Sequence, residues 1–175
     1  MKKSLLLFCL LLAATTLSAQ EHLTFMGIPL DGDIAQFESR LVAQGFVPDD
    51  AFNRLTPEGV RIYNHGLFFA EEAQVLVYYD PDTDLVYRAQ AVVEQGSKRQ
   101  VRQLFKRFKR RLLKAHTHRA DYIKLQIDGH EAGYFKVYDT TDQTHLGTIH
   151  LHVGEDNLGY TLRVDYLRQL PVADL

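Results

Sequence analysis

Two stretches of the chain place apolar residues at the spacing of a helix that packs on a core. In the first stretch, Ile34, Phe37 and Leu41 fall on one side of a helical wheel. Asp33 can cap the first N–H groups, and Gly45 can adopt the left-handed conformation that ends many helices. This pattern predicts a helix at residues 33–44.

The second helical stretch follows Ser97, which is a good residue for an N-cap. Its apolar residues recur at intervals of three and four, so they share one sector of the helix. They are Val101, Leu104, Phe105, Phe108, Leu112 and Ala115. The pattern predicts a helix whose apolar side packs against the rest of the protein.

Elsewhere the apolar residues alternate with polar ones, as they do in strands. Residues 59–69 are interpreted as two strands joined by a tight turn at Asn64-His65-Gly66, and residues 74–93 as two strands joined by a turn at 80–84. Residues 122–139 predict a hairpin with Asp128-Gly129 at its turn, and residues 147–167 predict another.

The order helix, four strands, helix, four strands predicts an α+β fold. We expect two αββββ repeats, at about 24–95 and 96–168, within a single domain that covers residues 20–175. Their strands would form an antiparallel sheet with the two helices packed on one face.

Residues 1–19 have the pattern of a secretory signal peptide. Lys2 and Lys3 precede an apolar run that is too short to span a bilayer, and small residues end at Ala19. No later stretch is apolar over a membrane-spanning length, so no transmembrane segment is expected after cleavage. Cys9 is the single cysteine and would leave with the signal, so the mature chain would have no disulfide. We expect a periplasmic or secreted protein.

Charge is unevenly distributed along the chain. The formal net charge is −2, and loss of Lys2 and Lys3 would make it −4. Residues 98–114 carry nine Lys or Arg and no acidic residue, which leaves −13 for the rest of the mature chain. Exposed helices usually mix charges and gain ~0.2–0.5 kcal/mol from each i, i+4 pair, so this composition is unusual.

Three hypotheses can explain the basic side of this helix. Acidic residues elsewhere can neutralise it, within the fold or across a contact between subunits. It can bind an external polyanion, such as an envelope component or an acidic protein. The third hypothesis, binding to nucleic acid, is not favoured, because an exported protein rarely meets nucleic acid and no recognition motif is present. The candidate partner-binding residues are Arg99, Lys106, Arg107, Arg110 and Lys114.

The residues offer little for common catalytic chemistry. Ser39 lies inside a predicted helix, Ser97 is a predicted cap, and no glycine-rich phosphate loop is present.

His150 and His152 project from the same face of a predicted strand and are the candidate metal ligands, although no spacing identifies a third ligand. We expect no cofactor. Tyr78, His150, His152 and Arg163 are expected on the open face of the sheet.

Two resemblances add to this picture. The layout resembles the tandem-repeat proteins whose best-known member is the β-lactamase inhibitor protein, in which each repeat is a helical element followed by a four-stranded antiparallel sheet. The inhibitor's repeats carry disulfides and this mature chain has no cysteine, so no inhibitory function or binding residue is carried over. The opening also resembles small uncharacterised secreted proteins of Bacteroides-like bacteria, a likeness that implies no activity. The residues behind it are Phe25, Gly27, Ile28, Pro29, Leu30, Phe37, Leu41, Gly45 and Phe46.

The favoured hypothesis is an exported, non-enzymatic binding module that recognises a protein or an anionic envelope component. One alternative is a small metal-dependent or acid–base enzyme that uses the His and Asp clusters. Another is a structural subunit that self-associates through the basic helix.

Overall fold

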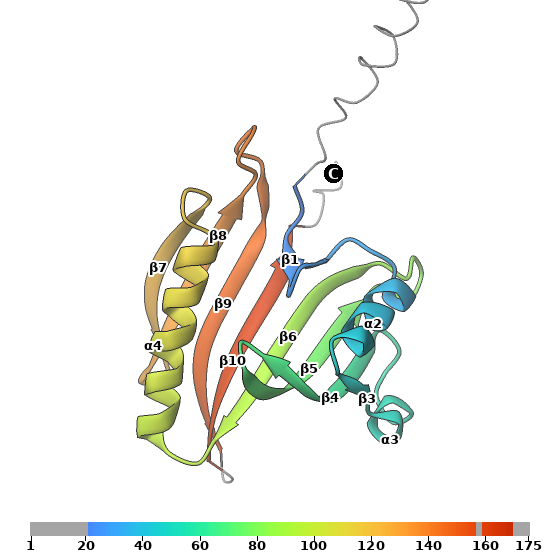
Figure 1. Ribbon diagram of the computed structural model, residues 1–175, viewed down its shortest axis with the longest axis horizontal. Helices are drawn as coiled ribbons and strands as arrows, with labels where there is room; N and C mark the ends of the chain where they lie inside the picture. The colour runs from blue at the N-terminus through green and yellow to red at the C-terminus, as the bar shows by residue number, and fades with distance from the viewer. Residues whose placement is uncertain (1–20, 157–158, 170–175) are drawn as a thin grey trace, which may run out of the picture.

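The computed structural model describes residues 21–156 and 159–169, which form an α+β fold (Figure 1). The predicted signal peptide at 1–19, with Cys9, lies outside the described residues. Among the residues that the structure describes, no helix is long and apolar enough to cross a membrane. The helices are α2 (Ile34–Ala43), α3 (Asp50–Asn53) and α4 (Lys98–Ala115). The strands are β1 (Thr24–Phe25), β2 (Ile28–Pro29), β3 (Val47–Pro48), β4 (Val60–Phe68), β5 (Glu71–Tyr79), β6 (Val86–Gln95), β7 (Ala120–Ile127), β8 (His130–Tyr138), β9 (His145–Asp156) and β10 (Gly159–Arg168).

Eight strands form one sheet in the order β3-β4-β5-β6-β10-β9-β8-β7, and every neighbouring pair is antiparallel. β1 and β2 form a separate two-stranded sheet. Within each half of this sheet, strands that follow one another in the chain are neighbours. In the middle of the sheet, β6 pairs with β10, which comes four strands later in the chain. The predicted antiparallel sheet of an α+β fold is confirmed.

The predicted turn at Asn64-His65-Gly66 is wrong. These residues lie inside the single strand β4, where the register shifts between Tyr63 and Gly66. Two residues of β4 oppose one residue of β5 there, which is a β-bulge, and His65 takes a φ of 63°. The chain reverses later, at Phe69-Ala70, where both φ angles are positive as in a two-residue hairpin turn. The first half therefore contributes three long strands and the two-residue β3 to the large sheet.

The predicted start and end of α2 and the predicted turn between β7 and β8 agree with the structure. Asp33 caps α2 by accepting a hydrogen bond from the Ala35 N–H at 2.7 Å, and Gly45 follows the helix with a φ of 94°. Asp128 and Gly129 form the turn between β7 and β8 with φ angles of 51° and 75°. The four-residue helix α3 was not predicted.

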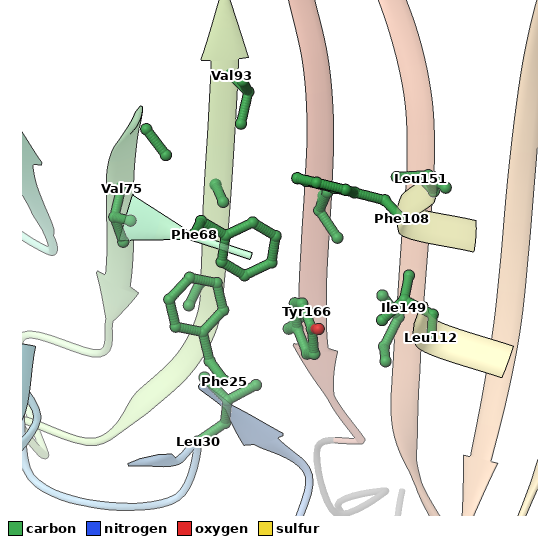
Figure 2. Packing of buried hydrophobic residues seen from close by; sticks show 14 of the residues in the cluster. Phe25, Leu30, Phe68, Val75, Val93, Phe108, Leu112, Ile149, Leu151 and Tyr166 are labelled. Atoms are coloured by element: carbon green, nitrogen blue, oxygen red, sulfur yellow. The ribbon is translucent and has the colours of Figure 1, made fainter. Parts of the chain in front are cut away.

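One face of the large sheet forms the core. Val75, Ala91, Val164 and Leu151 are paired in register across β5, β6, β10 and β9, and all four are buried. The helices α2 and α4 lie on this face (Figure 1). Figure 2 shows Phe25, Phe68, Phe108 and Tyr166 packed between the sheet and the elements in front of it. The Phe25 ring stacks on Phe68 at 5.3 Å, and Phe68 meets Phe108 of α4 edge to face at 5.6 Å.

Candidate functional site

The helix α4 is held in place by its cap and its apolar side. The Ser97 Oγ accepts a hydrogen bond from the Gln100 N–H at 3.4 Å and donates one to the Gln100 Oε1 at 2.6 Å. The cap satisfies one of the N–H groups that the first helical turn leaves unpaired, and the Gln100 side chain holds the Ser97 hydroxyl in place. Five of the six residues predicted to face the core are buried: Val101, Leu104, Phe105, Phe108 and Leu112. The sixth prediction was wrong, because Ala115 is exposed at the last turn.

The C-terminal end of α4 meets a buried histidine. His116 is 7 % exposed, and its Nδ1 accepts a hydrogen bond from the Arg119 Nε at 3.3 Å. Burial, with a smaller contribution from the Arg119 charge, lowers the pKa of His116 to about 4. The Arg119 guanidinium also pairs with Glu21 at 3.2 Å, which ties the described N-terminal segment to this end of the helix.

We call the side of α4 that carries Arg99, Lys106, Arg107, Arg110 and Lys114 the basic face. All five side chains are exposed, as the helical wheel predicted. The structure pairs one of them internally, because Arg107 forms an ion pair with Glu71 of β5. Its neighbour Arg111 donates a hydrogen bond of 2.8 Å to the Phe69 carbonyl and lies over the Phe69 ring. The β4–β5 turn therefore holds the middle of α4.

The other four residues of the basic face have no such partner in the part of the chain that the structure describes. No carboxylate oxygen of the described residues lies within 4.0 Å of the charged groups of Arg99, Lys106, Arg110 or Lys114. The Arg110 Nε reaches only the Lys106 carbonyl, at 3.4 Å. Neutralisation within the fold, one of the three hypotheses for this helix, is thus seen as a contact at Arg107 alone among the five.

The opposite face of the sheet, which we call the open face, has a polar centre. Asp165 of β10 is only 4 % exposed and is paired in register with Gln90 of β6 and His150 of β9. Its Oδ1 accepts hydrogen bonds from Arg88 Nε at 2.9 Å and Nη2 at 2.6 Å, and its Oδ2 accepts one from Gln90 Nε2 at 2.7 Å. The Arg88 guanidinium in turn lies 4.4 Å from the centre of the Tyr78 ring. Both oxygens of this buried carboxylate therefore accept hydrogen bonds, which offsets its desolvation.

Sequence reasoning placed Tyr78 and Arg163 on the open face but missed this network. The alternation in residues 86–93 does place Arg88 and Gln90 on the face opposite Ala89 and Ala91. That signal was available in the sequence. It could not show that Asp165, which lies 77 residues from Arg88, would stand beside it.

The metal candidates His150 and His152 lie two residues apart on β9, so both are on the open face. They are paired with Asp165 and Arg163 of β10, respectively. Burial lowers the pKa of both imidazoles, although the nearby Asp165 carboxylate acts in the opposite direction. The His150 ring also packs against Tyr134 at 4.8 Å. Within residues 21–156 and 159–169, no group of three or more His, Cys, Asp or Glu is placed to hold a metal ion.

Comparisons of the chain with protein-family models, with curated proteins and with solved structures found no match.

Proposed function

We propose that the chain is an exported, non-enzymatic binding module that recognises an acidic partner, a protein or an anionic envelope component, through the basic face of α4. The observation that carries the proposal is that Arg99, Lys106, Arg110 and Lys114 are exposed and have no carboxylate within 4.0 Å among the described residues.

The stability of α4 does not explain these charges. Burial of a large apolar side chain contributes ~1.5–3 kcal/mol, so the five buried residues of α4 are sufficient to dock it. Like charges at i, i+4 spacing, such as Lys106 and Arg110, weaken a helix by ~0.2–0.5 kcal/mol per pair. Residues that reduce helix stability while remaining exposed are better explained by an interaction outside the fold.

Two further parts of the proposal concern export and an internal repeat. The signal-like pattern at residues 1–19 supports export. The strand order supports two αββββ repeats, since β3-β4-β5-β6 is followed by β10-β9-β8-β7, so that the two halves of the sheet mirror each other about the central β6–β10 pair. Both halves also place a helix on the same face of the sheet (Figure 1).

Charge reversal tests the role of the basic face. The variant is Arg99→Glu/Lys106→Glu/Arg110→Glu, and the matched control is Arg40→Glu/Arg54→Glu/Lys136→Glu, which makes the same change in net charge at exposed residues elsewhere. Binding is measured to two probes, poly-L-glutamate and vesicles that contain phosphatidylglycerol, with phosphatidylcholine vesicles as a neutral reference.

We expect wild-type protein and the control variant to bind at least one anionic probe. This binding should weaken as salt shortens the Debye length from ~10 Å at 0.1 M. The α4 variant should lose it. Equal binding by the two variants, or no binding by wild-type protein at low salt, would remove the proposal.

A further inference from the structure

The strand β7 forms one edge of the large sheet and pairs only with β8 among the described strands. The Arg119 carbonyl accepts a hydrogen bond from the Tyr138 N–H at 2.8 Å, which sets the phase of the β7–β8 ladder. Residues of an antiparallel strand alternate in the direction of their backbone groups. Tyr122, Lys124 and Gln126 therefore point their N–H and C=O groups away from β8, toward the edge.

Among the described residues, this edge carries Lys124 but lacks two other devices that protect a strand from further pairing, a proline and a bulge. β7 contains no proline, and its register with β8 is continuous from Ala120 to Ile127. The other edge strand, β3, is only two residues long and contains Pro48. An eight-residue edge with unpaired backbone groups is a ready site for the addition of another strand.

The side chains of β7 differ between the two faces of the sheet. Ile123, Leu125 and Ile127 are 44 %, 43 % and 46 % exposed, and pairing with Tyr134 and Ala132 places Ile123 and Leu125 on the open face. A strand added beside β7 would bring its own alternate side chains against this apolar row. These positions of the added strand should therefore be apolar.

On the other face, the added strand would meet the basic helix. A hollow of about 270 Å³ lies between α4 and the β7–β8 hairpin, lined by Arg102, Lys106, Lys124, Gln126, Gly129 and Glu131. The Lys109 Nζ lies 4.2 Å from the centre of the Tyr122 ring, so α4 runs close to β7 on this face. In Figure 1 the helix follows the side of the sheet that β7 borders. Three cationic side chains and one carboxylate line this hollow, so its formal charge is positive, and side chains that point from the edge toward this face should be acidic.

We propose that the β7 edge binds an extended segment of an acidic protein partner as a ninth strand, with apolar side chains on the open face and acidic side chains toward α4. This inference rests on the proposed function and names the class of partner for the basic face. A second copy of the chain fits less well, because a twofold axis through two β7 strands would bring both basic α4 helices to the same side of the seam. The charges of Lys106 and Lys124 and their copies would then repel.

The probe is a capped seven-residue peptide in which Glu alternates with Ile or Val. One control peptide has the same composition with its apolar residues together. A second control has methylated backbone nitrogens at alternate residues, which removes donors to the edge. We expect wild-type protein to bind the alternating peptide at least about tenfold more tightly than either control, as measured by calorimetry.

Two protein variants separate backbone pairing from charge. Gln126→Pro removes an outward N–H that β8 does not use, and Gln126→Thr is its matched control. We expect the proline variant to weaken binding about tenfold and the threonine variant to leave it unchanged. Lys106→Glu should weaken binding and reduce its salt dependence. Because the methylated peptide is tested on wild-type protein, the result does not depend on correct folding of the proline variant.

The outcomes distinguish the two proposals. If the three peptides bind equally, or if Gln126→Pro binds like Gln126→Thr, edge pairing is wrong, although binding of poly-L-glutamate would still support the basic face. If wild-type protein binds none of the anionic probes, both the edge pairing and the proposed role of the basic face are wrong. A dimer in sedimentation that Gln126→Pro dissociates would replace the acidic partner by a second copy.

Discussion

The network around Asp165 allows a direct test of how the centre of the sheet is stabilised. Asp165→Ala removes a carboxylate that is 4 % exposed and accepts three hydrogen bonds from Arg88 and Gln90. Breaking a buried ion pair by removing one partner costs ~3–5 kcal/mol. The Arg88 side chain is 31 % exposed and can regain water, so we expect a loss of about 2–3 kcal/mol in the free energy of unfolding.

A double-mutant cycle with Arg88→Ala isolates the pair. Both single variants should be destabilised, and the double variant should lose less than the sum of the two by at least about 1 kcal/mol, since each single variant already breaks the interaction. Urea unfolding followed by far-ultraviolet circular dichroism measures these free energies. A coupling within about 0.3 kcal/mol of zero would contradict the role assigned to the pair.

The same variant has a second readout at the neighbouring imidazoles. The Asp165 carboxylate raises the pKa of His150 and His152 against the effect of burial. Asp165→Ala should therefore lower the pKa of both residues further, which a histidine NMR titration can follow. Unchanged titration of both imidazoles would mean that the carboxylate does not act on them.

Two further predictions concern His116 and Gly66. Because the pKa of His116 is lowered to about 4 in the folded protein, the unfolded chain binds a proton first as pH falls, so stability should decrease by about 2–3 kcal/mol from pH 6.5 to 4. His116→Gln should flatten this part of the stability profile measured by urea unfolding, and an unchanged slope would exclude His116 as its source. A Cβ at Gly66 would overlap the Phe46 ring, so Gly66→Ala should destabilise by ~1–3 kcal/mol, whereas Gly32→Ala, with its nearest atom 3.8 Å away, should change stability little. Equal melting temperatures for the two alanine variants would contradict the packing assigned to the bulge.

Local signals in the sequence predicted the elements that depend on neighbouring residues. Asp33 and Ser97 mark the starts of two helices because a cap needs only the next three residues. Asp128-Gly129 marks a hairpin because its positive φ angles are a property of the turn itself. The same reasoning failed at Gly66. Glycine there makes room for Phe46, which is a contact across 20 residues and not a turn.

The sequence by itself determined that α4 is a helix with an apolar side and a basic side that has no acidic residue of its own, because both follow from its own period of 3.6 residues. Only the tertiary structure decided which charges find partners. The fold places Glu71 beside Arg107 and Asp165 beside Arg88, whereas among the described residues Lys106 meets no carboxylate. It also decided that β7 is the last strand of the sheet, next to that helix. Strand order depends on pairing between distant segments, and no periodicity along one segment specifies its neighbour.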